Sequence, residues 1–156
     1  MKESLDKATE ELKRVDHLVF VSLKYTRTAD VLKNILQRMI NAFSFGFEAL
    51  LIYAKEQKLI TDYPENKALR CNTLKEIYPN EKRLHEYIDY YLKLRKIMRA
   101  EYTKTEEYRR HVTMSVVIDG EPIDITMDSV KEDFEMLKEF IKYIKEFIFG
   151  KPEEEY

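Results

Sequence analysis

FSFGFEALLIYA, residues 43–54, is apolar almost all the way round a helix and decides how the chain is organised. It forms the second half of a helix predicted over residues 29–57, and Thr28 or Asp30 is placed to cap that helix. The first half carries one apolar seam at Leu32, Ile35, Leu36, Met39 and Ile40. A helix that is apolar on all sides is expected at the centre of a bundle or at a subunit interface.

Two residues interrupt this apolar stretch. Gly46 weakens a helix by up to about 1 kcal/mol relative to Ala, which indicates a close approach of another helix at that position. Glu48 is the single charge in the stretch, and a buried carboxylate without a partner is costly. We therefore expect Glu48 to have an arginine as its ion-pair partner or to face a wet groove.

Four further helices are predicted on either side of this one. Apolar spacing of three and four places them at about residues 3–24, 65–77 and 81–109, with a final helix from Asp128 or Ser129 to Gly150. Asn80 is placed to cap the helix that begins near residue 81. The prediction is an all-α bundle of about five helices.

The pattern changes from a helical period to strict alternation after His111. Two β-branched runs surround Asp119-Gly120, which is a typical hairpin turn, so a β-hairpin is predicted over about residues 112–127. Two strands alone are marginally stable, and the hairpin is therefore expected to pack on the bundle or to pair with another chain. No linker divides the chain, so residues 1–156 are predicted to form a single domain.

Composition narrows the class of protein. The 156 residues are 44% hydrophobic and 36% charged, with a net charge of -2, which argues against strong overall attraction to nucleic acid or anionic lipid but allows a local basic patch. The single cysteine, Cys71, and the absence of a secretory pattern favour a cytoplasmic location. The most apolar run, residues 39–54, is short for a membrane span. Abundant Lys and Glu with two glutamines resemble a thermophile-like composition.

Common catalytic signatures are missing. The three glycines, Gly46, Gly120 and Gly150, cannot form a phosphate-binding loop. The histidines have no cysteine or carboxylate at metal-ligand spacing, so neither a metal nor another cofactor is predicted.

The notable chemistry lies in the helix predicted over residues 81–109. At about 100° per residue, one stripe of this helix changes from apolar to cationic and extends for about 22 Å. The stripe contains Arg95, Arg99, Tyr102 and Arg109, with Arg110 slightly further round. Guanidinium groups beside an aromatic ring suit a phosphate, a nucleotide or a carboxylate. The alternatives are internal ion pairs, for example with Glu48, or a salt-bridge network at a subunit interface.

The stretch LRKIMRAEY, residues 94–102, resembles the motif of HEPN domains, the higher-eukaryote and prokaryote nucleotide-binding helical bundles. Their motif is Arg-Asn-x-x-x-His-x-Tyr, and Arg95 and Tyr102 stand in register with it. Lys96 occupies the asparagine position and Ala100 the histidine position. The helix order and the alanine- and aromatic-rich second helix are also similar, over roughly residues 3–110 and 128–149.

The resemblance implies a mostly antiparallel bundle, a homodimer, and an arginine-bearing helix that lines a cleft between protomers. Active members of the family cleave RNA without a metal, and others pair with a small nucleotidyltransferase in toxin-antitoxin or stress systems. Ala100 can neither donate nor accept the proton that such cleavage needs.

The sequence therefore favours a non-catalytic nucleotide- or RNA-binding partner module of HEPN type that makes no use of a membrane. Its predicted ligand-binding residues are Arg95, Arg99, Tyr102, Arg109 and Arg110. Two other functions stay open: a metal-independent ribonuclease with a non-standard active site, and a purely structural dimeric interaction protein.

Overall fold

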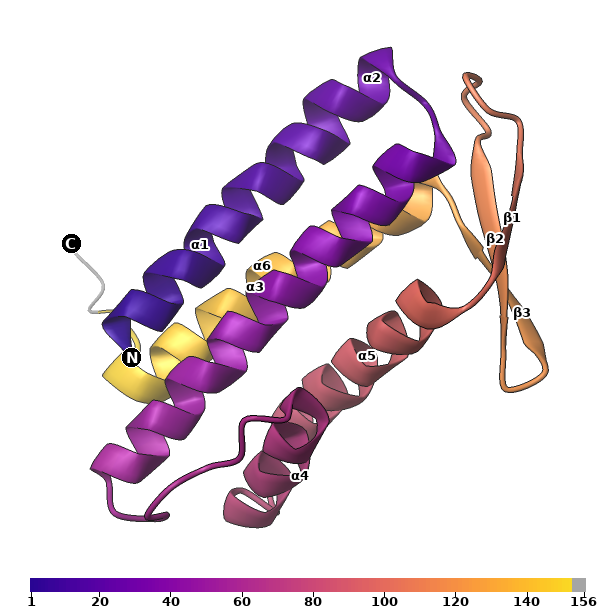
Figure 1. The fold of residues 1–156 in the computed structure, drawn as a ribbon. Coiled ribbons are helices and arrows are strands. Elements are labelled where there is room, and N and C mark those ends of the chain that lie inside the picture. The colour runs from indigo at the N-terminus through magenta and orange to yellow at the C-terminus, as the bar shows by residue number, and fades with distance from the viewer. Residues whose placement is uncertain (153–156) are drawn as a thin grey trace.

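The computed structural model describes residues 1–152 and is mostly helical, 68%, with a small antiparallel sheet before the last helix (Figure 1). The predicted fold class is correct at this level. The elements are α1 (Lys2–His17), η1 (Leu18–Ser22), α2 (Leu23–Tyr25), α3 (Ala29–Glu56), α4 (Lys67–Ile77), α5 (Lys82–Arg99), β1 (Tyr102–Thr105), β2 (Thr113–Ile118), β3 (Glu121–Ile125) and α6 (Met127–Phe149).

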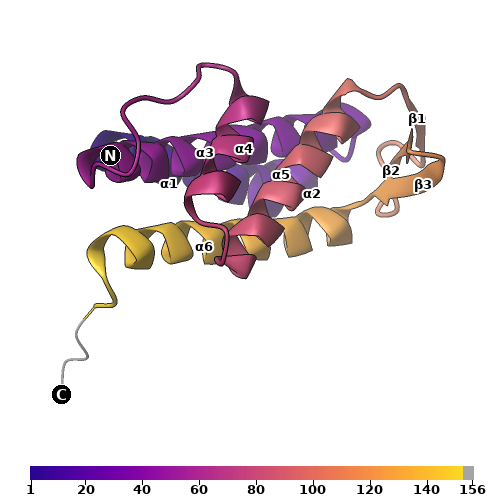
Figure 2. The same cartoon turned by 90° about the horizontal axis from the view of Figure 1, so that it is seen from below.

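α3 is the centre of the bundle. It packs against α1, α4, α5 and α6, and α1 and α5 run one way along the bundle while α3 and α6 run the other (Figure 1). Seen from below, α6 forms one side of the molecule and the sheet closes one end (Figure 2). The all-round apolar character of residues 43–54 is therefore explained within one chain, because different faces of α3 contact different helices.

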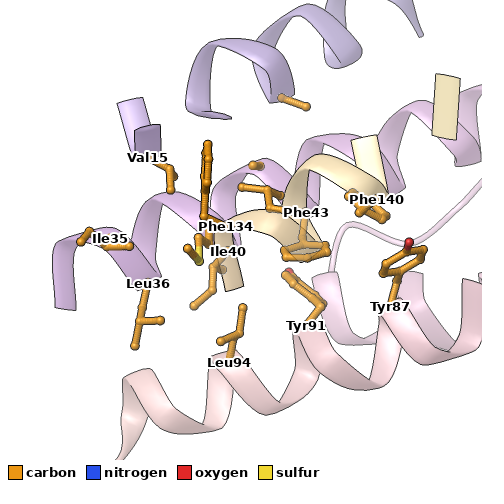
Figure 3. Packing of buried hydrophobic residues seen from close by; sticks show 14 of the residues in the cluster. Val15, Ile35, Leu36, Ile40, Phe43, Tyr87, Tyr91, Leu94, Phe134 and Phe140 are labelled. Carbon is orange, nitrogen blue, oxygen red and sulfur yellow. The ribbon is translucent and has the colours of Figure 1, made fainter. Parts of the chain in front are cut away.

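An aromatic cluster joins α3, α5 and α6, the three longest helices. The ring centroid of Phe140 on α6 lies 4.5 Å from that of Phe43 and 5.0 Å from that of Phe47, both on α3. Tyr91 on α5 completes the cluster, with its ring centroid 5.3 Å from that of Phe47. Figure 3 shows Tyr91 beside Phe43 and Phe140. Gly46 lies directly beneath Phe140, which confirms the close helix approach predicted at that glycine.

The long helix α3 also meets the length and hydropathy criteria for a membrane span. An 18-residue window of it has a mean hydropathy of 1.3, but 61% of that window is buried inside the protein. Core helices of globular domains share these properties, because a helix at the centre of a bundle needs apolar side chains on several faces.

Two buried polar contacts join helices. Glu11 of α1 is 6% exposed, and its Oε1 lies 2.9 Å from Arg14 Nη1 and 3.4 Å from Arg38 Nη1 of α3. Tyr90 of α5 donates a hydrogen bond to Asp133 of α6. Burial raises the pKa of both groups, and the nearby Asp133 carboxylate raises the pKa of Tyr90 further.

The helix ends follow capping chemistry in part. Thr28 accepts a hydrogen bond from the Val31 N–H, so its predicted role as a cap is confirmed. The cap of α6 is Thr126 rather than Asp128 or Ser129, although Ser129 accepts a hydrogen bond from the Thr126 N–H within a reciprocal capping box. Asn80 does not cap α5, which begins after Glu81 without a side-chain cap.

The main error concerns residues 100–110. The helix predicted to reach Arg109 ends at Arg99, where Ala100 adopts an extended conformation (φ −76°, ψ 150°). Residues 102–105 instead form β1, which pairs with β2 in antiparallel register, Tyr102 opposite Val116. The reason is that residues 101–106 carry no apolar stripe that a bundle could bury, whereas a third strand supports an otherwise marginal hairpin.

The predicted hairpin is present as β2 and β3, with Asp119 and Gly120 in its turn at φ of 52° and 82°. Left-handed conformations at both positions are typical of a two-residue hairpin turn, and Gly120 adopts its φ without strain. Met114, Val116 and Ile125 bury their side chains against the helices, so the sheet packs on the bundle of its own chain.

Candidate anion-binding site

The candidate site is centred on Arg95 and Arg99, one helical turn apart in the last part of α5. The guanidinium carbon of Arg95 lies 5.6 Å from the centre of the Tyr91 ring. The Tyr91 hydroxyl is in turn 2.7 Å from Ser44 Oγ on α3. Arg95 is therefore positioned by a cation–π contact with a ring that is itself held to the central helix.

A pocket of about 290 Å³ opens beside these arginines, between α3, the beginning of α4 and α5. We call it the anion pocket, and its lining residues are Gln37, Ile40, Asn41, Lys67, Tyr91, Arg95, Met98 and Arg99. Three of the eight are cations and none is a carboxylate. Gln37 Nε2 donates to Asn41 Oδ1 across 3.0 Å, which fixes the two amides relative to each other.

Arg95 has an unsatisfied donor in this setting. Its Nη1 atom is buried and donates to no acceptor within residues 1–152. Neither Arg95 nor Arg99 forms an ion pair within this part of the chain, although nine such pairs occur elsewhere in it. A buried guanidinium N–H without an acceptor is costly, so Arg95 has unused hydrogen-bonding capacity beside the pocket.

A second and larger hollow of about 680 Å³ shares the same two arginines and lies between α5 and the tip of the hairpin. This hairpin groove is lined by Leu92, Lys93, Lys96, Ile118 and Ile123 together with Arg95, Arg99 and the carboxylates Asp89, Asp119 and Glu121. Lys96 and Asp119 face each other across 3.3 Å, and Asp89 pairs with Lys75 at 2.7 Å. The hairpin groove is thus of mixed charge, unlike the anion pocket.

Arg95 also influences its buried neighbours. Burial raises the pKa of the Cys71 thiol to about 11, and the positive charge of Arg95 opposes that rise. Burial likewise raises the pKa of Tyr91, while its hydrogen bond with Ser44 and the Arg95 charge lower it. At neutral pH both groups are therefore uncharged, and no side-chain anion among them competes for the arginines.

The structure brings together only part of the predicted site. Arg95 and Arg99 share the anion pocket, whereas Tyr102 lies on β1 with the Lys33 ammonium 5.2 Å from its ring centre. Arg109 and Arg110 lie in the loop between β1 and β2, because the chain leaves the helix at Ala100. The predicted stripe of four arginines on one helix is therefore wrong beyond Arg99.

Glu48 does not have the expected arginine partner. It is half-buried and forms no ion pair within residues 1–152, and the buried carboxylate that pairs with arginines is Glu11. Sequence reasoning also missed Lys67, Gln37 and Asn41. The spacing of Gln37 and Asn41 places them on one face of α3, but nothing in the sequence places Lys67 beside α5.

The eight residues that line the anion pocket include no serine, cysteine, histidine or carboxylate. His85 is hydrogen-bonded to the Tyr78 carbonyl oxygen at 2.8 Å, and His111 lies in the exposed β1–β2 loop. The described residues also contain no group of three or more His, Cys, Asp or Glu side chains that could hold a metal ion.

Comparison with known proteins finds no matching family, no matching curated protein and no matching solved structure.

Proposed function

We propose that this chain is a non-catalytic module that binds a phosphorylated ligand, a nucleotide or RNA, in the anion pocket. The observation that carries the proposal is a pocket lined by Lys67, Arg95 and Arg99 and by no carboxylate, with a buried Arg95 N–H that lacks an acceptor within residues 1–152. Two guanidinium groups one turn apart suit the oxygens of a single phosphate.

Several features support binding in preference to a purely structural role for these arginines. A structural role requires an internal acceptor, and within residues 1–152 neither Arg95 nor Arg99 has a carboxylate partner. The Tyr91–Ser44 contact holds Arg95 in place without neutralising its charge. A bound anion would supply the acceptor and counter-charge that Arg95 lacks, and would so offset the cost of burying its guanidinium group.

The HEPN-type assignment, with its toxin-antitoxin or stress context and its nucleotidyltransferase partner, remains a prediction from the resemblance of residues 94–102 and of the helix order. The cytoplasmic location remains a prediction from the single cysteine and the absence of a secretory pattern. The predicted homodimer also remains a prediction. The all-round apolar surface of residues 43–54 is weak support for it, because α3 contacts α1, α4, α5 and α6 of its own chain. Sedimentation at high protein concentration tests it, and a monomer under those conditions would contradict it.

The binding proposal is tested by titrating fluorescently labelled RNA with protein and following anisotropy at several salt concentrations. The double variant Arg95→Ala/Arg99→Ala should weaken binding, and the slope of log affinity against log salt should become shallower by about 0.7 for each phosphate that is no longer neutralised. Lys142→Ala/Lys145→Ala on α6 removes the same charge from a different surface and serves as the control. An unlabelled mononucleotide as competitor shows whether one phosphate group suffices.

Equal binding by the wild type and the arginine variant would remove the proposal. RNA cleavage by the purified protein in the presence of a chelator, lost on Arg95→Ala, would instead favour the metal-independent ribonuclease.

A further inference from the structure

A separate aromatic and cationic surface lies where the β1–β2 loop contacts the connection between α2 and α3. The Tyr108 N–H donates to the Arg27 carbonyl oxygen across 2.6 Å, which joins segments far apart in the sequence. We call this surface the tyrosine platform and define it by Tyr25, Arg27, Tyr108, Arg109 and Arg110. In Figure 1 the β1–β2 loop is at the top of the sheet, at the end of the bundle where the connection between α2 and α3 lies.

The two tyrosines are presented to solvent. Tyr25 is 78% exposed and Tyr108 is 77% exposed, although a tyrosine side chain has enough apolar surface to favour burial. Tyr108 has φ of 65° and Glu106 has φ of 57°. A bulky residue seldom adopts this left-handed conformation, and such strain is concentrated at functional sites. The hydrogen bond to Arg27 holds the loop in this shape.

The surroundings of the tyrosines are cationic. The segments that carry the tyrosines contain five cations, Lys24, Arg27, Lys104, Arg109 and Arg110, and three carboxylates, Asp30, Glu106 and Glu107. Arg110 also lines a hollow of about 200 Å³ together with Asp128 and Lys131 of α6. Glu107 pairs with Lys104 at 3.1 Å and Glu106 with Arg109 at 3.7 Å. Arg27 and Arg110 form no ion pair within residues 1–152, and the buried Arg27 Nε has no acceptor there. The Lys24 ammonium lies 5.9 Å from the Tyr25 ring centre.

We infer that the tyrosine platform binds single-stranded nucleic acid, with bases stacked on Tyr25 and Tyr108 and phosphates contacted by Arg27, Arg109 and Arg110. Exposed aromatic rings among cations are the usual means of binding a flexible single strand, because every base offers a face for stacking. A double helix keeps its bases stacked on one another and cannot use these rings in this way.

The inference deepens the proposed function and rests on it for the nature of the ligand. β1 connects the two sites: its four residues, at about 3.3 Å each, separate the end of α5 from the loop by roughly 13 Å of strand. A strand of several nucleotides is long enough to span this separation, whereas a mononucleotide is not.

The test measures the affinity of the full chain for a labelled single-stranded oligonucleotide of about 12 nucleotides. Tyr108→Ala and Tyr25→Ala should each weaken binding by about tenfold, while Tyr108→Phe should bind as the wild type does. Phe149→Ala removes another exposed aromatic ring, at the far end of α6, and should have no effect. Unchanged melting temperatures of the two alanine variants show that the fold is intact.

The outcomes separate the two proposals. Loss of binding in the tyrosine variants with no loss in Arg95→Ala/Arg99→Ala supports the platform and overturns the anion pocket. Loss in the arginine variant alone supports the pocket and overturns the platform. Equal affinity for the single strand and for a duplex of the same sequence also overturns the platform, because a duplex offers charge without stacking.

Discussion

The Phe140 ring of α6 lies directly against Gly46 of α3, so that a methyl group added to Gly46 would come within 2.6 Å of Phe140 Cζ. The glycine is therefore a packing requirement in the middle of the central helix, where its low helix propensity is otherwise a disadvantage.

Gly46→Ala should destabilise the protein. Alanine favours the helix by up to about 1 kcal/mol, but overpacking in a core usually costs about 1–3 kcal/mol, and the ring cannot shift freely among Phe43 and Phe47. Urea unfolding followed by circular dichroism measures the change. In Gly46→Ala/Phe140→Leu the smaller side chain makes room for the methyl group, and the loss should be less than the sum of the single losses. Additive losses would contradict the contact.

Arg95→Met distinguishes a binding role from a structural one. Methionine keeps much of the apolar stem but removes the buried N–H that has no acceptor within residues 1–152, so the free energy of unfolding should stay within about 0.5 kcal/mol or increase. Binding of labelled RNA should weaken at the same time. A loss of about 2 kcal/mol or more would indicate that Arg95 has an internal partner and would favour the structural alternative.

Glu11→Gln should destabilise the contact between α1 and α3. The Glu11 carboxylate is buried and lies near Arg14 and Arg38, and its neutral replacement leaves both guanidinium groups without a counter-charge. We expect a loss of about 2 kcal/mol in urea unfolding, because the carboxylate is buried while the arginines are partly exposed. Glu10→Gln changes an exposed neighbour and should alter stability by no more than about 0.5 kcal/mol.

Asp133→Asn should change how stability depends on pH. Burial raises the folded pKa of Asp133 above its ordinary value of 3.8, so the folded state holds this proton more tightly than the unfolded state does. The Asp133 contribution to stability therefore falls as pH rises from the unfolded pKa to the folded pKa, and is constant above it. Asparagine still accepts the Tyr90 hydrogen bond but does not titrate.

The measurement for Asp133 is the difference in unfolding free energy between wild type and variant across this range of pH. The free energy of unfolding of Asp133→Asn, relative to that of the wild type, should increase as pH rises. Tyr90→Phe is the companion variant, since it leaves a buried carboxylate without its donor and should cost about 1–3 kcal/mol. A difference between Asp133→Asn and wild type that does not vary with pH would show that Asp133 titrates as an ordinary carboxyl group.

The helices could be predicted because each buries a face whose spacing is local. Leu32, Ile35 and Leu36 mark α3, and Val130, Phe134 and Leu137 mark α6, without knowledge of any partner. β1 could not be predicted in the same way. Tyr102 to Thr105 became a strand because β2 lies beside it, and pairing between Tyr102 and Val116 is a contact that no local pattern records.

The site residues also divide into those that local spacing predicts and those that only the fold brings together. Arg95 and Arg99 are neighbours by helical periodicity, and they do share a pocket. Lys67 reaches that pocket from the beginning of α4, a position set by the path of the chain after α3. A helix that continued past Ala100 would place Arg109 and Arg110 on the surface of Arg95 and Arg99, but the chain leaves the helix at Ala100 and enters β1, so they lie elsewhere.

The central place of α3 has a consequence for synthesis on the ribosome. α3 ends at Glu56 and α6, which covers its aromatic face, begins at Met127, so about 70 residues are translated between them. At about 5–20 residues per second this interval lasts roughly 4–14 s. For that time the nascent chain carries a long apolar helix that lacks its last cover, and this is the period in which chaperone binding would protect it most.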